Sequence, residues 1–353
     1  MTRRNARRGR LERASALVAI VTLVGLAMSS CGGGGSTSAA DEPVFPGRCP
    51  TVSQPASGNG AASRVQLKVL KQGTAAIALA PVCVAGHGPY PFVVDTGAGS
   101  SVFDSQLVKE LHLAANGPAA STGAVNCNAT QTPVSGPSWS LGSVPLAAQT
   151  INSIDIPGFG LRSSPAGLLG SDVLSRFGAV QLDYQHQSLA LPGPEGPPPA
   201  SDTNVHGPSS VAVPPGINLA SPSRSVPLIV VQAEGETAAI VPMRIRGQGP
   251  FNFILDTGSA ESSVDPHVVS SIGLPQTGKH KRAAGVGCTK EVPQVQSGPW
   301  SAGTVSLPSQ NLLQSVPLPG VSEINGLLGS DVLHGFGAVV IAYSGGSLLV
   351  AAH

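Results

Sequence analysis

Charged side chains are scarce in this chain: they account for only 11% of its 353 residues, and the formal net charge at pH 7 is +1. So small and balanced a charge provides no basic face for binding DNA or RNA, and we therefore expect no nucleic-acid partner. Hydrophobic residues make up 41% of the chain, which is enough to bury a core, and the length allows two modest domains with additional tails.

The sequence also lacks the residue clusters that hold structural zinc, since it contains no Cys-x-x-Cys pair and no grouping of cysteine with histidine. We expect the protein to require no metal ion and no cofactor. Of its five cysteines, Cys31 lies near the N-terminus, which leaves Cys49, Cys83, Cys127 and Cys288. Outside the cytoplasm, four cysteines favour two disulfide bonds, and all three pairings are open at this point.

The hydrophobic run near the N-terminus, Ser15 to Met28, is too short for a membrane-spanning helix, because its fourteen residues fall below the roughly 20 that are needed. A basic segment precedes this run, and small residues and then Cys31 follow it. The pattern resembles a bacterial lipoprotein signal, in which the cysteine becomes the lipidated N-terminus. We therefore predict a signal peptide over residues 1–30, lipidation of Cys31 and a flexible tether over residues 31–64. The protein would be anchored to the outer face of the cell membrane; an ordinary secretory signal or an uncleaved anchor are the alternatives.

The chain contains an internal repeat. Residues 65–97 align with residues 226–258 without a gap, at an offset of 161. The segment GLLGSDVL occurs at 167–174 and again at 326–333, at an offset of 159. An ordered series of matches over so long a stretch indicates duplication rather than chance.

The repeat divides the chain into two homologous lobes, residues 65–192 and 226–353, joined by a Pro/Gly/Ser-rich linker over residues 193–225. Within each lobe, short runs of Val, Ile and Leu separated by Gly and Pro predict β-strands. Apolar spacing predicts only short helices, within 104–113 and 265–274. The segment GSDVLSRFG, at 170–178, is typical of one or two further helical turns. We thus expect an all-β fold.

Each lobe carries an Asp-Thr-Gly triplet, at 95–97 and at 256–258, directly after an apolar strand. About 70 residues later, each triplet is followed by an apolar-apolar-Gly segment. This order resembles that of the aspartic peptidases, and most closely the retropepsin-like fold, over both lobes nearly end to end. The resemblance implies two homologous retropepsin-like lobes that form a bilobal aspartic protease with a pseudo-twofold axis.

The resemblance also implies a catalytic dyad of Asp95 and Asp256, with one aspartate from each lobe. In the family, the threonine hydroxyls of the triplets brace the opposite lobe. The triplet glycines leave room for backbone beside the carboxylates, and the apolar segments back the two active-site loops. The supporting residues implied in this way are Thr96, Gly97, Thr257, Gly258, Leu168, Leu169, Gly170, Leu327, Leu328 and Gly329.

Paired carboxyl groups suit the hydrolysis of a peptide bond. The peptide carbonyl is a poor electrophile, so water must be activated while the carbonyl oxygen is protonated. Repulsion between adjacent carboxyls keeps one protonated while the other is ionised, so the pair supplies an acid and a base together. We therefore predict an exported, monomeric aspartic endopeptidase that binds an extended polypeptide between its lobes. The alternatives are a catalytically silent cell-envelope binding protein, or lobes that each pair with a second chain.

Several other residues occupy notable positions in the repeat. Asp172 and Asp331 recur at the start of a short predicted helix, so we interpret them as N-terminal caps. Trp139 and Trp300 are equivalent and are interpreted as core residues. Glu261, after the second triplet, has no acidic counterpart after the first and is a candidate for tuning the charge of the cleft.

By the resemblance, flaps that cover the cleft should lie around residues 115–130 and 276–291, and neither range contains a tyrosine. Cys127 and Cys288 occupy equivalent positions near these flaps. A disulfide bond between the lobes and separate pairing with the other two cysteines are both open.

Overall fold

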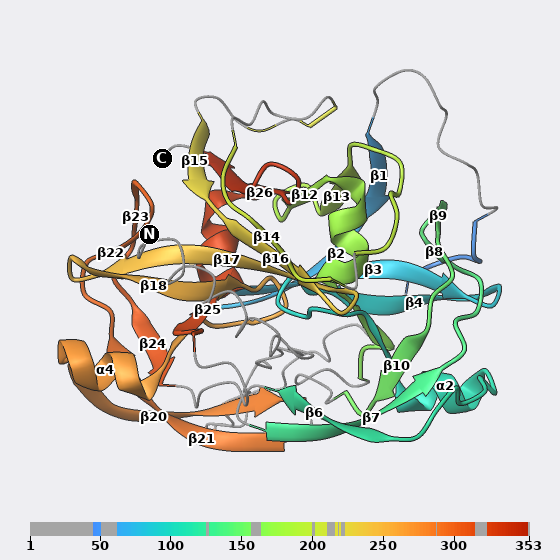
Figure 1. Cartoon of the computed structure of the whole chain (residues 1–353), viewed down its shortest axis with the longest axis horizontal. Coiled ribbons are helices and arrows are strands. Elements are labelled where there is room, and N and C mark those ends of the chain that lie inside the picture. Colours follow the sequence, from blue (N-terminus) through green and yellow to red (C-terminus); the bar gives the residue numbers. More distant parts are fainter. Residues whose placement is uncertain are drawn as a thin grey trace, which may run out of the picture.

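The described part of the protein covers most of both predicted lobes. The computed structural model of the chain describes residues 45–50, 62–124, 127–156, 164–199, 202–209, 216–217, 219, 223–286, 288–314 and 323–351. The predicted signal peptide and Cys31 lie outside these residues. Strands predominate in the described ranges and the helices are short, which confirms the all-β fold (Figure 1). None of the helices in these ranges is long and apolar enough to span a membrane.

The first lobe is built around a 10-stranded sheet with the order β6-β7-β10-β5-β11-β4-β3-β8-β9, in which β2 also pairs with β3. Its strands are the Val/Ile/Leu-rich runs between Gly- and Pro-containing turns. The elements of this lobe are β2 (Lys68–Gln72), β3 (Ala75–Val84), β4 (His87–Val94), β5 (Val102–Asp104), α2 (Ser105–Glu110), β6 (Ala120–Ala124), β7 (Cys127–Val134), β8 (Trp139–Leu141), β9 (Val144–Leu146), β10 (Ile151–Ile154), β11 (Gly167–Leu169), α3 (Ser171–Leu174) and the 3₁₀ helix η2 (Ser175–Phe177).

The second lobe repeats this arrangement in an 11-stranded sheet with the order β14-β16-β17-β18-β25-β19-β24-β21-β20, and β22 and β23 form a hairpin beside β17. The elements are β14 (Asn204–His206), β16 (Ile229–Ala233), β17 (Glu236–Ile245), β18 (Gln248–Leu255), β19 (Ser263–Val264), α4 (Pro266–Ile272), β20 (Gln276–Gly285), β21 (Cys288–Gln296), β22 (Trp300–Ala302), β23 (Val305–Leu307), β24 (Asn311–Gln314), β25 (Gly326–Leu328), α5 (Ser330–Leu333) and the 3₁₀ helix η3 (His334–Phe336). The helices predicted within 104–113 and 265–274 are α2 and α4.

A six-stranded sheet of order β1-β13-β12-β26-β27-β15 joins the two lobes. Its central contact is the antiparallel pairing of β12 with β26, in which Gln181 lies opposite Val340. Each lobe therefore contributes its closing hairpin to a shared sheet. The strands of this sheet are β1 (Ser63–Gln66), β12 (Ala179–Asp183), β13 (Ser188–Leu191), β15 (Ser223–Pro227), β26 (Ala338–Ala342) and β27 (Ser347–Ala351).

The lobes also share one hydrophobic core. The largest cluster of buried residues includes Val94 and Val180 from the first lobe together with Leu255 and Val339 from the second. The equivalent tryptophans belong to the same cluster and are 3–4% exposed, which confirms their assignment to the core. Burial of apolar surface across the boundary favours association of the lobes within one chain.

Two segments that composition alone assigned to the tether and the linker contain ordered contacts. In the tether range, Phe45 is only 9% exposed and Cys49 is bonded to Cys83, so a freely tethering segment would end before Phe45. In the linker range, β14 pairs with β16 and β15 pairs with β27. Composition misses these contacts because the partner of each segment lies far away in the sequence.

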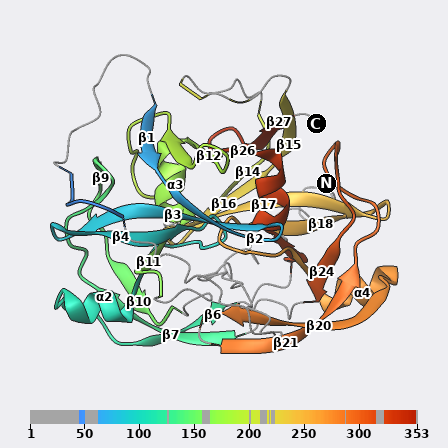
Figure 2. The same cartoon turned by 180° about the vertical axis from the view of Figure 1, so that it is seen from behind.

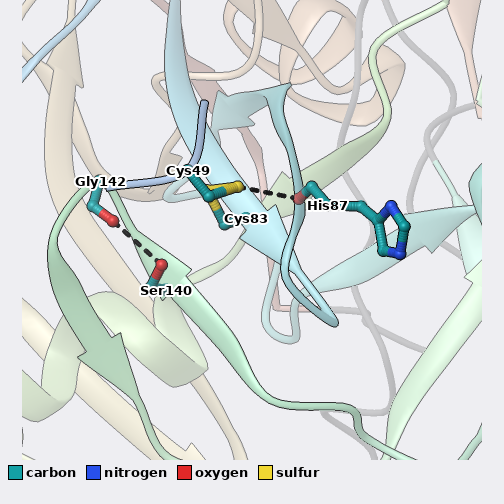
Figure 3. The surroundings of a disulfide bond; sticks show 5 residues. All are labelled: Cys49, Cys83, His87, Ser140 and Gly142. Carbon is teal, nitrogen blue, oxygen red and sulfur yellow. Dashed lines mark hydrogen bonds between the residues drawn. A yellow bond between two sulfur atoms is a disulfide. The ribbon is translucent and has the colours of Figure 1, made fainter. Parts of the chain in front are cut away.

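The disulfide bond between Cys49 and Cys83 fastens residues 45–50 to strand β3 (Figure 3). The two Cα atoms are 5.8 Å apart, within the usual range for a disulfide. This bond excludes pairing of Cys127 or Cys288 with either of these two cysteines. The side chains of Cys127 and Cys288 lie outside the described residues, so a bond between them stays a prediction.

Removing the disulfide bond should destabilise the first lobe. The bond closes a loop with a sequence separation of 34, and the chain-entropy relation assigns such a loop about 3–4 kcal/mol of unfolding free energy. Urea unfolding of a Cys49→Ala/Cys83→Ala variant, compared with the wild type, measures this loss. A change below about 0.5 kcal/mol would contradict a stabilising role of the bond.

Candidate active site

Each triplet aspartate lies at the end of a central strand of its lobe. Asp95 follows β4, and Asp256 follows β18. Beside each of these strands runs a Leu-Leu-Gly segment in parallel, β11 in the first lobe and β25 in the second. The amide of Asp95 donates to the carbonyl of Leu169, and the amide of Asp256 donates to the carbonyl of Leu328, both at 3.0 Å. The predicted apolar segments therefore hold the backbone from which each carboxyl group projects.

The two triplets bind each other through their threonines. The amide of Thr96 donates to Oγ1 of Thr257, and the amide of Thr257 donates to Oγ1 of Thr96, both at 3.1 Å. Each hydroxyl donates in turn to a strand of the other lobe, Thr96 to the carbonyl of Leu255 at 2.8 Å and Thr257 to that of Val94 at 2.7 Å. Both threonines are buried. These four bonds brace each triplet against the opposite lobe, as the resemblance implies.

The two carboxyl groups lie at this contact between the lobes. Oδ1 of Asp95 accepts hydrogen bonds from the amides of Gly97 and Ala98, both at 3.0 Å. Oδ1 of Asp256 accepts from the two equivalent amides, at 3.0 and 2.8 Å. A Cβ atom at Gly258 would stand 2.4 Å from Cγ of Asp95, so only glycine fits there. The carboxyl of Asp95 therefore touches the triplet of the second lobe.

The electrostatic environment favours a proton on the pair. Burial raises the pKa of Asp95 well above its ordinary value, the negative charge of Asp256 raises it further, and the two amide bonds oppose this rise. Both side chains are 0% exposed. Two carboxyls that repel each other titrate as a pair, and over a range of pH they hold one proton between them. The arrangement can present a carboxylate and a carboxylic acid at the same time.

A second carboxylate in each lobe supports the active-site loop. In the first lobe, Oδ1 of Asp172 accepts from both the amide and the hydroxyl of Ser101, at 2.8 and 2.7 Å. Oδ2 of Asp172 accepts from Gln149 at 2.7 Å. The hydroxyl of Ser101 also accepts from the amide of Gly170 at 2.9 Å. Asp172 thus connects the loop after the triplet to the Leu-Leu-Gly segment.

The second lobe repeats this brace. Asp331 accepts from the amide and the hydroxyl of Ser262, at 3.0 and 2.7 Å, and from Gln310 at 2.7 Å. The helices α3 and α5 begin at glycine caps that make no side-chain cap bond. The prediction that Asp172 caps its helix is therefore wrong. Asp331 accepts one hydrogen bond from an amide of its own helix, that of Val332, and its other bonds go to the active-site loop and to Gln310.

The sequence did contain a signal for these braces. A serine stands six positions after each triplet aspartate, at Ser101 and Ser262, and the partner aspartates also recur. Recurrence of the same Ser and Asp pair in both lobes is the sequence signal that indicates a contact between the two residues. Among the residues that the structure describes, no group of three or more His, Cys, Asp or Glu side chains is placed to hold a metal ion.

The two predicted flaps correspond to the hairpins β6–β7 and β20–β21. In both views these hairpins lie along one edge of the molecule and point toward each other (Figures 1 and 2). The ranges 115–130 and 276–291 fall on them, although the second strand of each hairpin extends beyond the predicted end. Val286, next to the turn of the second hairpin, is buried in a cluster that includes Ala129 of the first. Residues of the two hairpins therefore meet in one buried apolar cluster.

Comparison with known proteins agrees with this geometry. A family model described as aspartyl protease matches residues 80–173 and residues 241–332, one match in each lobe. The chain belongs to the aspartyl protease family. The search of curated proteins found no match to this chain. Among solved structures, it is similar to the basic 7S globulin from soybean, with 14% identity over 82% of this chain and 95% of that chain. The TM-score of that match is 0.39.

Replacing Thr96 with valine should destabilise the contact between the lobes. The Leu255 carbonyl and the Thr257 amide would each lose a partner while staying buried, and each such group costs about 1–3 kcal/mol. Urea unfolding of Thr96→Val should therefore show a loss of about 2–5 kcal/mol. Thr96→Ser keeps the hydroxyl and serves as the matched control; an equal loss in both variants would contradict the role of these bonds.

Replacing Asp95 with asparagine should raise the thermal stability at neutral pH. The pKa of Asp95 is raised in the folded protein, so the folded state keeps a proton that the unfolded chain has already released. The free energy of unfolding of the wild type therefore falls as the pH rises from the unfolded-state pKa, about 3.9, to the folded-state pKa. Asparagine cannot ionise, so Asp95→Asn should melt higher at pH 7, by about 1–2 °C for each kcal/mol relieved in a chain of this length. The gain should shrink toward pH 3.

Calorimetric scans at both pH values test this expectation. Asp202→Asn, at an exposed aspartate, is the control and should leave the melting temperature unchanged at either pH. A gain for Asp95→Asn that is the same at pH 3 and pH 7 would contradict the assignment to a raised pKa.

Proposed function

We propose that this member of the aspartyl protease family is an exported aspartic endopeptidase whose dyad is Asp95 and Asp256. The observation that carries the proposal is the meeting of the two triplets across the lobe boundary. The carboxyl of Asp95 touches Gly258, and the charge of Asp256 helps to raise the pKa of Asp95. A pair with one shared proton fits the acid and base roles of peptide hydrolysis.

In the proposed reaction, a water molecule bound by the two carboxyls attacks the peptide carbonyl. The ionised carboxyl accepts a proton from the water, and the protonated carboxyl donates its proton to the carbonyl oxygen. The carboxyl that took the water proton then donates it to the leaving nitrogen, and the other carboxyl, now ionised, takes a proton back from a hydroxyl of the tetrahedral intermediate. The C–N bond breaks, and the pair returns to its starting state with one shared proton. The amides of Gly97 and Ala98 hold Oδ1 of Asp95 in place, so the carboxyl needs little reorganisation during these transfers.

The substrate in this proposal is an extended polypeptide bound between the lobes and under the flaps. In the described part of the chain, β6 and β20 are the end strands of their sheets. An extended peptide can add to such an edge through backbone hydrogen bonds, with its alternate side chains entering pockets. This binding mode suits cell-envelope or secreted proteins with accessible extended segments.

Export and lipidation at Cys31 are part of the proposal and rest on the sequence pattern. The disulfide bond between Cys49 and Cys83 supports an oxidising location, because such bonds persist outside the cytoplasm. A monomer is supported by the contacts within one chain, namely the threonine bonds and the pairing of β12 with β26. Pairing of each lobe with a second chain is therefore not needed to complete the site.

Cleavage of a diverse peptide library between about pH 3 and pH 7 tests the function, since a carboxyl dyad titrates in or near this range. The wild type should cleave, and Asp95→Asn and Asp256→Asn should each lose at least about 10²–10⁴-fold in rate. Full activity in either variant would contradict a shared dyad. Tight peptide binding without cleavage by the wild type would instead favour the catalytically silent binding protein.

A further inference from the structure

The two flaps differ in one feature that the duplication does not explain. On the second flap, Nζ of Lys281 forms an ion pair with Oε1 of Glu261, which lies in the loop after the second triplet. At the offset of 161, the equivalent residues of the first lobe are Ala120 and Ser100. These cannot form an ion pair, so only the second flap is joined to its active-site loop by opposite charges.

Strand geometry directs Lys281 toward this loop. Successive side chains of a strand point to opposite faces, and along β20 Lys281 and Ala283 are half-buried or buried, while His280 and Arg282 are exposed. The side chains of Lys281 and Glu261 are 32% and 23% exposed. The pair is thus partly shielded from water, which makes it stronger than an ion pair on an open surface.

The partner of Lys281 belongs to a firmly held loop. The carbonyl of Glu261 accepts a hydrogen bond from the hydroxyl of Ser259 at 2.8 Å. The next residue, Ser262, is bound through both its amide and its hydroxyl to the carboxyl group of Asp331. Burial lowers the pKa of Lys281, and the negative charge of Asp331 opposes this effect. The ammonium group therefore faces a fixed site with two acidic groups.

No other ion pair in the described part of the chain connects a flap with an active-site loop. The remaining pairs join Arg176 with Glu195 and Asp183 with His186, away from both hairpins. In the first lobe, the hydroxyl of Ser100 instead contacts Glu236 of the second lobe, at 3.5 Å. The charged group that contacts the first active-site loop therefore comes from the opposite lobe and not from the first flap.

The position of the second flap matters for the cleft. Val286, beyond Lys281 on the same hairpin, is fully buried in a cluster with Ala98 and Ala260, which follow the two triplet aspartates. An interaction that fixes the hairpin therefore also fixes the apolar cover over the dyad. A flap that is already closed reduces the ordering cost when a peptide binds beneath it.

We propose that Lys281 is a positioning residue, whose ion pair with Glu261 holds the second flap over the dyad and thereby strengthens substrate binding. The first flap, with Ala120 and Ser100 at the equivalent positions, has no such ion pair. This proposal rests on the proposed function for its effect on substrate, but the closure of the flap itself does not depend on catalysis.

Two measurements on the full chain test the proposal. Hydrogen exchange reports closure directly: Lys281→Ala should lower the protection of amides in residues 276–296 by roughly two- to fivefold and leave residues 120–134 unchanged. Peptide cleavage should show KM raised by a similar, roughly two- to fivefold factor with kcat little changed, as expected when only binding is lost. Arg282→Ala, the exposed neighbour on the same strand, is the matched control and should change neither quantity.

Further variants separate the ion pair from a general effect on the hairpin. Lys281→Arg should retain protection and KM, and the exchange Lys281→Glu with Glu261→Lys should restore most of both. Lys281→Ala combined with Glu261→Gln should lose no more than either single change. Unchanged exchange in Lys281→Ala, or additive losses in the double variant, would overturn the proposal. If the wild type cleaves no peptide, the proposed function fails and hydrogen exchange alone still decides the role of Lys281 in closure.

Discussion

The exchange of hydrogen bonds between Thr96 and Thr257 is the interaction on which the rest of the structure depends. Each threonine uses its amide, as donor, and its hydroxyl, as donor and acceptor, to reach the other lobe. Because all of these groups are buried, separating the lobes would leave several polar groups without partners. The threonines directly follow Asp95 and Asp256 in the chain, so the hydrogen bonds between them also set the position of one carboxyl group relative to the other. The six-stranded sheet and the shared core support this contact from outside.

A low overall charge makes the few buried charges informative. Charged residues account for 11% of the chain, yet Asp95, Asp256 and Asp172 are each buried, and Asp331 makes the same contacts as Asp172. Burying a carboxylate is costly unless hydrogen bonds or opposite charges compensate. Here each of these aspartates accepts amide hydrogen bonds, and the dyad accommodates the remaining repulsion by holding a proton. These four aspartates thus lie at, or directly behind, the site where proton transfer is proposed.

Duplication supplied two similar lobes, and the differences between them show how each was adapted. In the first lobe, Arg176 donates to the carbonyl of Asp172 and pairs with Glu195, which ties the start of the connecting segment to the brace behind the active-site loop. The second lobe has a glycine at the equivalent position and instead carries the charged contact on its flap, between Lys281 and Glu261. The pseudo-twofold axis therefore relates the dyad and its supports, while the periphery is asymmetric. An asymmetric periphery suits a polypeptide substrate, whose two directions along the cleft are not equivalent.

The resemblance to aspartic peptidases implied the Leu-Leu-Gly segments behind the active-site loops. The two lobes, the strand-rich fold and the triplets at strand ends could be predicted from the order of residues alone. These features depend on local periodicity and on comparison of the chain with itself, and both can be seen in the order of residues. Only the tertiary structure decided that Cys49 pairs with Cys83, that β14 and β15 form within a linker-like segment, and that Asp172 binds Ser101. It also decided that Lys281 meets Glu261. Each of these contacts joins segments distant in the chain, and which distant groups become neighbours depends on how the strands pair and pack in three dimensions.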